Sequence, residues 1–279
     1  MNKNNTYLTV LSSDDYLKGV LALNESLKAT GTLIPFSVLV TGATSESSEN
    51  LIQKYGISTI RLNRTIELPE EMKRRNVSKN YSHWNSTLDK LFVFELMQFD
   101  KIVYLDSDMM VLENIYHLYY KTHMSAVDAA GKVPGNESWH GLNSGLLVIV
   151  PEKDIVEKLI EIIPQVVSEK ENIGDQDILQ SYFQDWIGNA DLKLDDKYNL
   201  FFSSIHHYIE LGYKIHSEKD EKNIAVVHFT GKVKPWMKKY DLRYKFKLFV
   251  KNLLGMQTES ERVLASYQRI VSKFNNCES

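Results

Sequence analysis

Cysteine is almost missing from this chain, and so are long apolar runs. The one cysteine among 279 residues is Cys277. No disulfide can therefore form within the chain, which favours a reducing compartment. No apolar run approaches the ~18 residues that a membrane-spanning helix needs, and the apolar run near the N-terminus is too short for a signal peptide. The expected location is the cytoplasm.

An excess of basic residues is also lacking. The chain has 33 lysines and arginines against 36 aspartates and glutamates, a net charge of -3. Proteins that bind nucleic acid are usually basic, so no nucleic-acid partner is expected. Hydrophobic residues make up 43% of the chain and charged residues 25%. This balance is typical of a globular protein with ample material for a core.

Apolar runs of strand length alternate with stretches of helical periodicity. The expected strands lie at 6–11, 36–41, 57–62, 101–105, 124–129, 144–150 and 224–230. The expected helices lie at 16–29, 45–56, 86–97, 151–170 and 174–183. The alternation predicts a mostly parallel sheet with helices on both faces.

Local signals refine the ends of these elements. Ser13 or Asp14 is expected to cap the first helix. Pro151 should open the fourth expected helix, and Pro164 should kink or end it. No repeat and no linker rich in Gly, Pro or Ser interrupts the chain. One domain over 1–279 is therefore expected, with a core at 6–240 and a helical tail at 241–279.

Two aspartates come directly after the expected strand at 101–105, in the stretch KIVYLDSDMMVL. Residues two apart on a strand point to the same side, so Asp106 and Asp108 can converge just beyond its carboxyl end. Ligands of open α/β sheets bind at that end, and converging carboxylates repel unless a cation lies between them. Such oxygen ligands suit Mg²⁺ or Mn²⁺. The alternative is an Asp-Ser-Asp turn that only caps the next segment of the chain.

A second polar cluster ends the last expected strand, in VVHFTGKVKPW (226–236). The imidazole of His228 can complete a carboxylate-bound Mn²⁺ site. Gly231 lets backbone approach a phosphate, and Lys234 can neutralise one. A structural histidine and a solvated lysine loop are the alternative, but one shared site explains all three features together.

Four stretches, in order, resemble the signatures of glycosyltransferase family 8: YLDSDMMVL, LNSGLLVIVP, GDQDILQSYF and HFTGKVKPW. The stretch YLTVLSSDDYLKGVLALNESL also resembles the family's nucleotide-binding first strand and helix. The resemblance spans roughly residues 6 to 240. It implies a fold of the GT-A type, a Rossmann-like, mixed and mostly parallel sheet flanked by helices, with a basic helical tail after it in this chain. It also implies a UDP-sugar donor, Mn²⁺ or alternatively Mg²⁺, and retention of the anomeric configuration.

The resemblance further implies roles for individual residues. The implied metal ligands are Asp106, Asp108 and His228. The implied nucleotide contacts are Leu11, Ser12, Ser13, Tyr16, Lys90, Ser107, Gly231 and Lys234, with the last two on the diphosphate. Asn143 and Ser144 would contact the donor sugar, and Asp175 and Gln176 would flank its anomeric carbon. The residues alone leave open a helix cap for Asp175, an exposed ion pair for Lys90 and a core aromatic for Tyr16.

The predicted activity is transfer of a hexose from UDP-glucose or UDP-galactose to a glycan or glycolipid acceptor. Retention requires either a nucleophile opposite the leaving group or attack on the same face, and both routes stay open. One alternative is a self-glucosylating primer of the glycogenin type, for which Tyr208 is the candidate acceptor. Another is a non-catalytic module that binds sugar nucleotides. Nucleotidyl transfer is disfavoured, because SSDDYLKG lacks the Gly-rich basic loop that it usually requires.

The stretch 232–251 is strongly basic, with eight lysines and arginines against one acid, Asp241. Aromatic residues are interleaved with these charges. A basic helix with an apolar stripe can lie on an anionic membrane surface, here the inner face of the membrane. The alternative is a packed terminal helix whose lysines are solvated.

Overall fold

The computed structural model describes residues 3–78, 82–170, 173–215, 221–238, 243, 246, 250–251 and 253–274. The chain forms two compact units. The first unit consists of Met1–Asp14, Leu33–Asp106 and Tyr116–Asp196. The second consists of Asp15–Thr32, Ser107–Ile115 and Lys197–Ser279. The prediction that 1–279 forms one domain stays a prediction.

The first unit is built on a seven-stranded sheet with the order β3-β2-β1-β4-β7-β6-β8. Its strands are β1 (Asn5–Leu11), β2 (Phe36–Val40), β3 (Ser58–Arg61), β4 (Lys101–Leu105), β6 (Ala126–Asp128), β7 (Leu142–Ile149) and β8 (Lys193–Leu194). The first four pair in parallel, and β7 runs antiparallel to both β4 and β6. The sheet is therefore mixed and mostly parallel, as predicted. Both β2 and β7 are buried along their whole length, which accounts for their continuous apolar runs.

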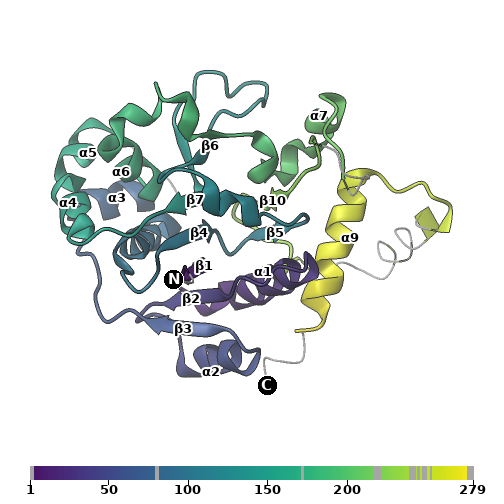
Figure 1. The fold of residues 1–279 in the computed structure, drawn as a ribbon, viewed down its shortest axis with the longest axis horizontal. Coiled ribbons are helices and arrows are strands. Elements are labelled where there is room, and N and C mark those ends of the chain that lie inside the picture. The colour runs from purple at the N-terminus through teal and green to yellow at the C-terminus, as the bar shows by residue number, and fades with distance from the viewer. Residues whose placement is uncertain are drawn as a thin grey trace. The chain divides into compact units, whose positions relative to one another are not determined.

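Helices of the first unit flank this sheet. They are α2 (Glu46–Lys54), α3 (Glu70–Ser78), α4 (Ile155–Glu161), α5 (Ile163–Glu169) and α6 (Asp175–Tyr182). Figure 1 shows α3 to α6 gathered together and α2 beside β3. Short 3₁₀ segments complete the unit: η2 (Ser82–Glu95), η3 (Tyr116–Tyr120), η4 (Gln184–Trp186) and η5 (Ala190–Leu192).

The second unit contains a small sheet with the order β5-β10-β9. Its strands are β5 (Met109–Val111), β9 (Leu200–Phe201) and β10 (Val226–His228), and its helices are α1 (Leu17–Ala29), α7 (Ile205–Glu210) and α9 (Glu259–Ser272). Further 3₁₀ turns are η1 (Asp14–Tyr16), η6 (Asp196–Tyr198) and η7 (Phe202–Ser204). Antiparallel pairing of β5 and β10 puts His228 opposite Met109, the residue after Asp108. This pairing brings two motifs about 120 positions apart in the sequence to one place.

The start of α1 differs from the prediction. Neither Ser13 nor Asp14 caps it; the 3₁₀ turn η1 intervenes, and α1 begins at Leu17 without a side-chain cap. The carboxylate of Asp14 instead accepts a hydrogen bond from the backbone N–H of Ser45, 3.1 Å away. The prediction was wrong because the side chain has a long-range partner that sequence spacing does not reveal.

The helix expected at 86–97 is a 3₁₀ helix, η2. With three residues per turn, Leu88, Leu91 and Phe94 share one face of this helix. Residues 90–94 are all buried, so the segment is enclosed on more than that face.

The helix expected at 151–170 is two helices. Pro164 separates them as predicted: α4 ends at Glu161, and α5 begins at Ile163 with the proline in its first turn. The prediction that Pro151 opens the helix was wrong, because α4 begins only at Ile155. Helices α3 and α7 and strands β5, β8 and β9 were not predicted.

Helix α9 lies in the C-terminal tail. It begins with a capping box, in which Thr258 Oγ1 accepts from the Glu261 N–H and Glu261 Oε2 accepts from the Thr258 N–H. Much of the basic stretch at 232–251 lies outside the described residues.

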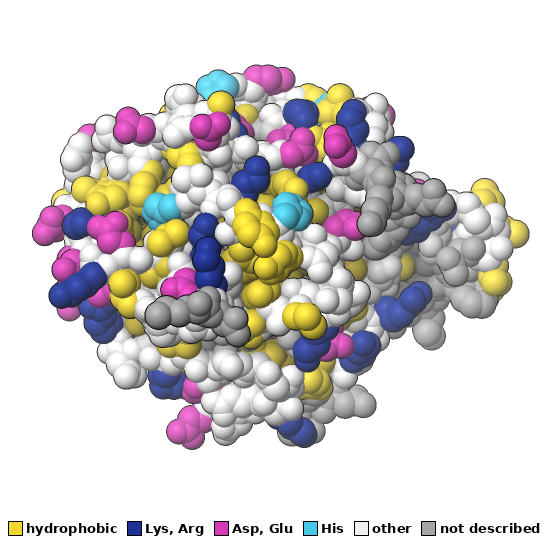
Figure 2. Space-filling model, viewed as in Figure 1, with side chains coloured by type: hydrophobic (Ala, Val, Ile, Leu, Met, Phe, Trp, Pro, Cys, Tyr) yellow, Lys and Arg dark blue, Asp and Glu magenta, His cyan; other side chains and the backbone are white. Residues whose placement is uncertain are grey.

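Charges of both signs are interspersed on the face shown in Figure 2, with hydrophobic side chains exposed between them. Among the helices that the structure describes, none has both the length and the apolar character that crossing a membrane requires.

Candidate active site

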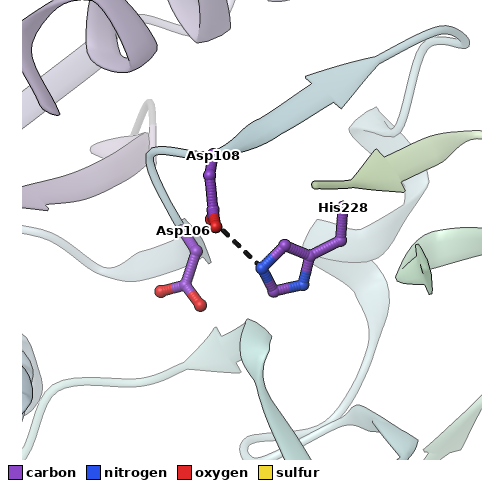
Figure 3. Close-up of side chains that lie close together, drawn as sticks. All are labelled: Asp106, Asp108 and His228. Carbon is purple, nitrogen blue, oxygen red and sulfur yellow. Dashed lines mark ion pairs between the residues drawn. The ribbon is translucent and has the colours of Figure 1, made fainter. Parts of the chain in front are cut away.

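Asp106 and Asp108 lie in the turn between β4 and β5 rather than on a strand. The expected convergence therefore arises from a turn, not from strand periodicity. Only Ser107 separates the two aspartates, and the boundary between the units falls directly after Asp106. One ligand atom from each of Asp106, Asp108 and His228 lies within 4.8 Å of the others (Figure 3). These are the three residues that the sequence analysis predicted as metal ligands, and their ligand atoms lie close enough together to hold one ion.

The second unit holds a buried charge cluster around Asp108. His228 Nε2 lies 3.1 Å from Asp108 Oδ1, and Lys234 Nζ lies 2.5 Å from Asp108 Oδ2. The side chains of all three residues are less than one-tenth exposed. Burial alone would raise the pKa of Asp108, but the attraction of His228 and Lys234 outweighs it and holds that pKa well below its usual range. The carboxylate is therefore charged and available to a cation.

Asn199 orients the imidazole of His228. The ring Nδ1 lies 2.9 Å from Asn199 Oδ1, and because a carboxamide oxygen only accepts, Nδ1 is the donor. The other ring nitrogen, Nε2, lies 3.1 Å from Asp108 Oδ1. Both atoms belong to the group that could hold a metal ion. The donor set of two carboxylates and an imidazole fits Mn²⁺ or Mg²⁺.

The first unit holds a second buried charge cluster, centred on Lys90. Its Nζ lies 2.6 Å from Asp175 Oδ2 and 3.0 Å from Asp106 Oδ1, and it also donates to the carbonyl of Ser144 at 3.2 Å. Burial alone would lower the pKa of Lys90, but Asp106 and Asp175 raise it well above its usual range. Lys90 is thus a buried bridge between two predicted site residues, not half of an exposed ion pair.

Asp106 is also held by its own strand. Tyr104 Oη donates to Asp106 Oδ1 at 2.7 Å, and the backbone N–H of Asp106 donates to the carbonyl of Gly145 at 2.8 Å. The hydroxyl of Tyr104 was not predicted as part of the site, although Tyr104 precedes the aspartate by only two positions.

Asp175 is the first residue of α6 and does not cap it. The capping residue is Gly174, whose N–H donates to Asp177 Oδ2 at 3.0 Å. Burial would raise the pKa of Asp175, but Lys90, Ser144 and Thr87 lower it below its usual value. Asp175 is therefore a buried carboxylate held charged by Lys90.

Two glutamines of α6 hold the start of β7. Gln176 Oε1 accepts from the Ser144 N–H at 3.3 Å, and Gln180 Oε1 accepts from the Leu142 N–H at 2.8 Å. The two glutamines are four residues apart on the helix, a rise of about 6 Å, and their partners are two residues apart on the strand, a rise of about 6.7 Å. The two spacings therefore match. The sequence analysis missed Gln180, although its spacing of four from Gln176 was a usable signal.

The predicted donor-sugar residues lie on β7. Asn143 and Ser144 are both buried. Asn143 Oδ1 accepts from the Gly145 N–H at 2.9 Å, which turns its carboxamide back onto the strand. The structure thus joins Ser144 to Lys90 and Gln176, whereas Asn143 makes a local hydrogen bond within its own strand.

The predicted nucleotide residues are divided between the units. Leu11 ends β1 and is buried, and Ser12 and Ser13 come after it, half-buried, in the first unit. Tyr16 lies in the second unit, where the Lys234 ammonium is 5.9 Å from its ring centroid. Of the remaining predicted nucleotide residues, Ser107 is buried and Gly231 is exposed. Gly231 has a φ of 98°, a backbone conformation that glycine adopts more easily than other residues.

Comparison with known proteins shows the family of the chain. The model of glycosyl transferase family 8 matches residues 7–239. Glycogenin-1 of Oryctolagus cuniculus is 29% identical over 245 residues, which cover 86% of this chain and 67% of the relative. Glycogenin-1 of Homo sapiens is 30% identical over 249 residues, which cover 86% of this chain and 64% of the relative. The chain thus spans about two thirds of the length of these glycogenins.

A solved structure shares the fold. Galactosyltransferase LgtC, in complex with donor and acceptor sugar analogs, superposes with a TM-score of 0.60 at 18% identity, covering 97% of this chain and 96% of LgtC. The architecture is therefore that of a GT-A type glycosyltransferase, as predicted. The chain belongs to glycosyl transferase family 8.

Proposed function

We propose that the protein transfers glucose or galactose from a UDP-sugar to a glycan or glycolipid acceptor, with retention of the anomeric configuration. The proposal also includes a divalent cation, Mn²⁺ or Mg²⁺, held by Asp106, Asp108 and His228. The observation that carries it is this ligand set with the buried ammonium of Lys234 beside Asp108. Family membership and the likeness to glycogenin and LgtC support it.

Departure of the UDP leaving group places negative charge on its diphosphate. A bound divalent cation would neutralise part of that charge. Lys234 Nζ lies 2.5 Å from Asp108 Oδ2, and its positive charge would also stabilise a diphosphate bound beside that carboxylate. Gly231, with a positive φ in the same loop, lets the backbone bend without a Cβ.

The sugar ring develops positive charge as the leaving group departs. The carboxamide oxygen of Gln176 is fixed by the Ser144 N–H and carries a partial negative charge suited to that developing charge. Asp175 is engaged by Lys90 at 2.6 Å, which reduces its strength as a nucleophile. This arrangement favours attack by the acceptor on the same face of the sugar over a covalent intermediate on Asp175.

The first test is release of UDP from UDP-glucose and from UDP-galactose, each with and without Mn²⁺. We expect metal-dependent release with one of the donors and its loss in Asp108→Ala. Asp185→Ala, an exposed aspartate in η4, is the matched control and should behave as wild type. Absence of both turnover and binding of either donor in Mn²⁺ would contradict the proposal, whereas binding without turnover would favour the binding-module alternative.

Similarity to glycogenin makes a self-glucosylating primer the second candidate. The predicted acceptor, Tyr208, lies in α7 with 3% of its surface exposed, and its ring centroid is 5.3 Å from that of Tyr213. A buried phenol can accept a sugar only after this packing opens, so transfer to a separate acceptor is preferred. The intact mass of the protein after incubation with UDP-glucose alone distinguishes the two candidates. A mass increase of one or more hexoses would establish that the protein glucosylates itself.

We also propose that the stretch 232–251 contacts the anionic inner face of a membrane, in keeping with a cytoplasmic enzyme. Among its described residues, the apolar Val233 and Phe246 are exposed, as are Lys232 and Lys238. Exposed apolar and basic side chains together suit an anionic bilayer surface. Vesicles with anionic lipid should co-sediment the protein at low salt and release it at high salt. Failure to bind at low salt would rule the contact out.

A further inference from the structure

Trp236 is joined to the N-terminal end of α1 within the second unit. Its indole Nε1 donates to the carbonyl of Asp15 at 2.9 Å. Its ring meets the ring of Tyr16 edge to face, with centroids 5.8 Å apart and planes at 74°. The segment after β10 is therefore anchored to the turn that opens α1, although 221 positions separate the two bonded residues.

Gly19 is the point on α1 that allows this contact. A Cβ built there would lie 2.7 Å from Trp236 Cη2 and 2.6 Å from the carbonyl oxygen of Ser107, closer than Cβ atoms approach other atoms. A glycine inside a helix lowers helix stability relative to alanine. At this position it permits α1 to pack against two segments at once: the Asp-Ser-Asp turn and the segment that carries Trp236.

Trp236 also sets the position of Lys234. Only Pro235 separates the two residues, and its ring restricts the backbone between them. The Lys234 ammonium donates to Asp108 Oδ2 at 2.5 Å and to the carbonyl of Phe229 at 3.2 Å. A shift of the indole would therefore move the ammonium relative to Asp108.

Helix α9 contributes an aromatic residue that packs on Phe229 and Trp236. Tyr267 is fully buried, and its ring centroid lies 4.5 Å from that of Phe229 and 6.2 Å from that of Trp236. Its hydroxyl has no hydrogen-bond partner among the residues that the structure describes. A buried hydroxyl without a hydrogen bond lowers stability, so the packing of the Tyr267 ring on Phe229 and Trp236 has to compensate for it. Tyr267 lies beyond residues 7–239, the range that matches the family.

We propose that Trp236 is a positioning residue for the diphosphate of the donor. Packed on Gly19 and Tyr16 and backed by Tyr267, it holds Lys234 and the Ser107–Asp108 turn in the arrangement that binds a metal–diphosphate group. The inference rests on the proposed function and adds a residue that is not among the predicted metal or nucleotide contacts.

The test is the affinity of the full chain for UDP in the presence of Mn²⁺, measured by titration calorimetry. Trp236→Ala should weaken binding about tenfold or more, as expected when a charge-assisted contact is misplaced. Trp236→Phe, which keeps an aromatic ring, should recover part of the loss. Trp139→Ala removes an exposed tryptophan of the first unit and is the matched control, with unchanged affinity expected.

A double-mutant cycle separates positioning from general destabilisation. If Trp236 acts through Lys234, the double variant Trp236→Ala/Lys234→Ala should bind UDP no more than about threefold more weakly than Lys234→Ala alone. Losses that add in full would overturn the inference, because they would show that the two side chains act independently.

Gly19→Ala approaches the same contact from the other side and leaves every proposed ligand in place. It should weaken UDP binding in Mn²⁺ while the variant retains a cooperative unfolding transition. If Trp236→Ala fails to fold, Gly19→Ala and Trp236→Phe still decide, and wild-type affinity in both would overturn the inference. Absence of UDP binding by the wild type would instead refute the proposed function and this inference with it.

Discussion

Lys90 and Asp175 form a buried ion pair, with Nζ and Oδ2 2.6 Å apart. The same ammonium lies 3.0 Å from Asp106, so one cation links the first aspartate of the Asp-Ser-Asp motif to the first residue of α6. Because both carboxylates depend on one buried lysine, the stability of this cluster should be sensitive to the loss of the lysine's charge.

Replacement of Lys90 by methionine should therefore destabilise the protein strongly. Asp106 and Asp175 would be left without their shared cation, and removal of one partner of a buried ion pair typically costs about 3–5 kcal/mol. The free energy of unfolding, measured in urea at neutral pH, checks this. Lys158→Ala breaks an exposed pair with Glu152 and serves as control; it should cost less than about 1 kcal/mol. Equal effects of the two variants would contradict the burial argument.

Removal of Asn199 should weaken metal binding without removing a ligand. Its carboxamide oxygen fixes the tautomer and orientation of His228, and partners of this kind commonly contribute about 10- to 100-fold to metal affinity. Titration of Asn199→Ala with Mn²⁺ measures the effect, and Asn114→Ala, which alters an exposed asparagine, is the control. Wild-type affinity for Mn²⁺ in Asn199→Ala would show that the ring needs no such support.

Gln180→Leu should lower both stability and donor turnover. The Leu142 N–H would lose its acceptor, at a cost of about 1–3 kcal/mol, and β7 would be free to shift beneath Gln176. Gln180→Glu keeps an acceptor oxygen and should retain most of the stability. Urea unfolding and UDP release measure the two effects, with the exposed Gln184→Leu as control. Unchanged turnover in a destabilised Gln180→Leu would limit Gln180 to a structural role.

Thr258→Ala should destabilise α9 by about 1 kcal/mol, the usual contribution of an N-cap hydroxyl. The hydroxyl accepts from the Glu261 N–H, and Thr258→Ser keeps that bond. Thermal unfolding of both variants measures the difference in stability, and Thr258→Ala should unfold at the lower temperature. Because α9 carries Tyr267, the alanine variant should also weaken UDP binding slightly more than the serine variant, and a reversed order would contradict the role given to α9.

Much of the architecture can be predicted from local patterns. The apolar runs that became β1, β2, β4 and β7 are long enough to identify strands. Pro164 likewise predicts the break between two helices, because proline is disfavoured inside a helix. The Asp-Ser-Asp and HFTGKVKPW motifs likewise identify chemistry by residue type. Residues 86–97 were harder, because helical periodicity alone does not separate an α helix from the 3₁₀ helix that formed.

The sequence by itself determined the longer strands, the family and the candidate ligands, because these depend on residue type and on spacing along the chain. The tertiary structure alone decided that His228 lies opposite Met109, that Lys90 is buried between two aspartates, and that Trp236 packs on Gly19. Each of these relationships joins residues far apart in the sequence, and a charged or aromatic side chain carries no local sign of its partner. Only the pairing of strands and the packing of helices fix which groups meet, and with that the electrostatics of the site.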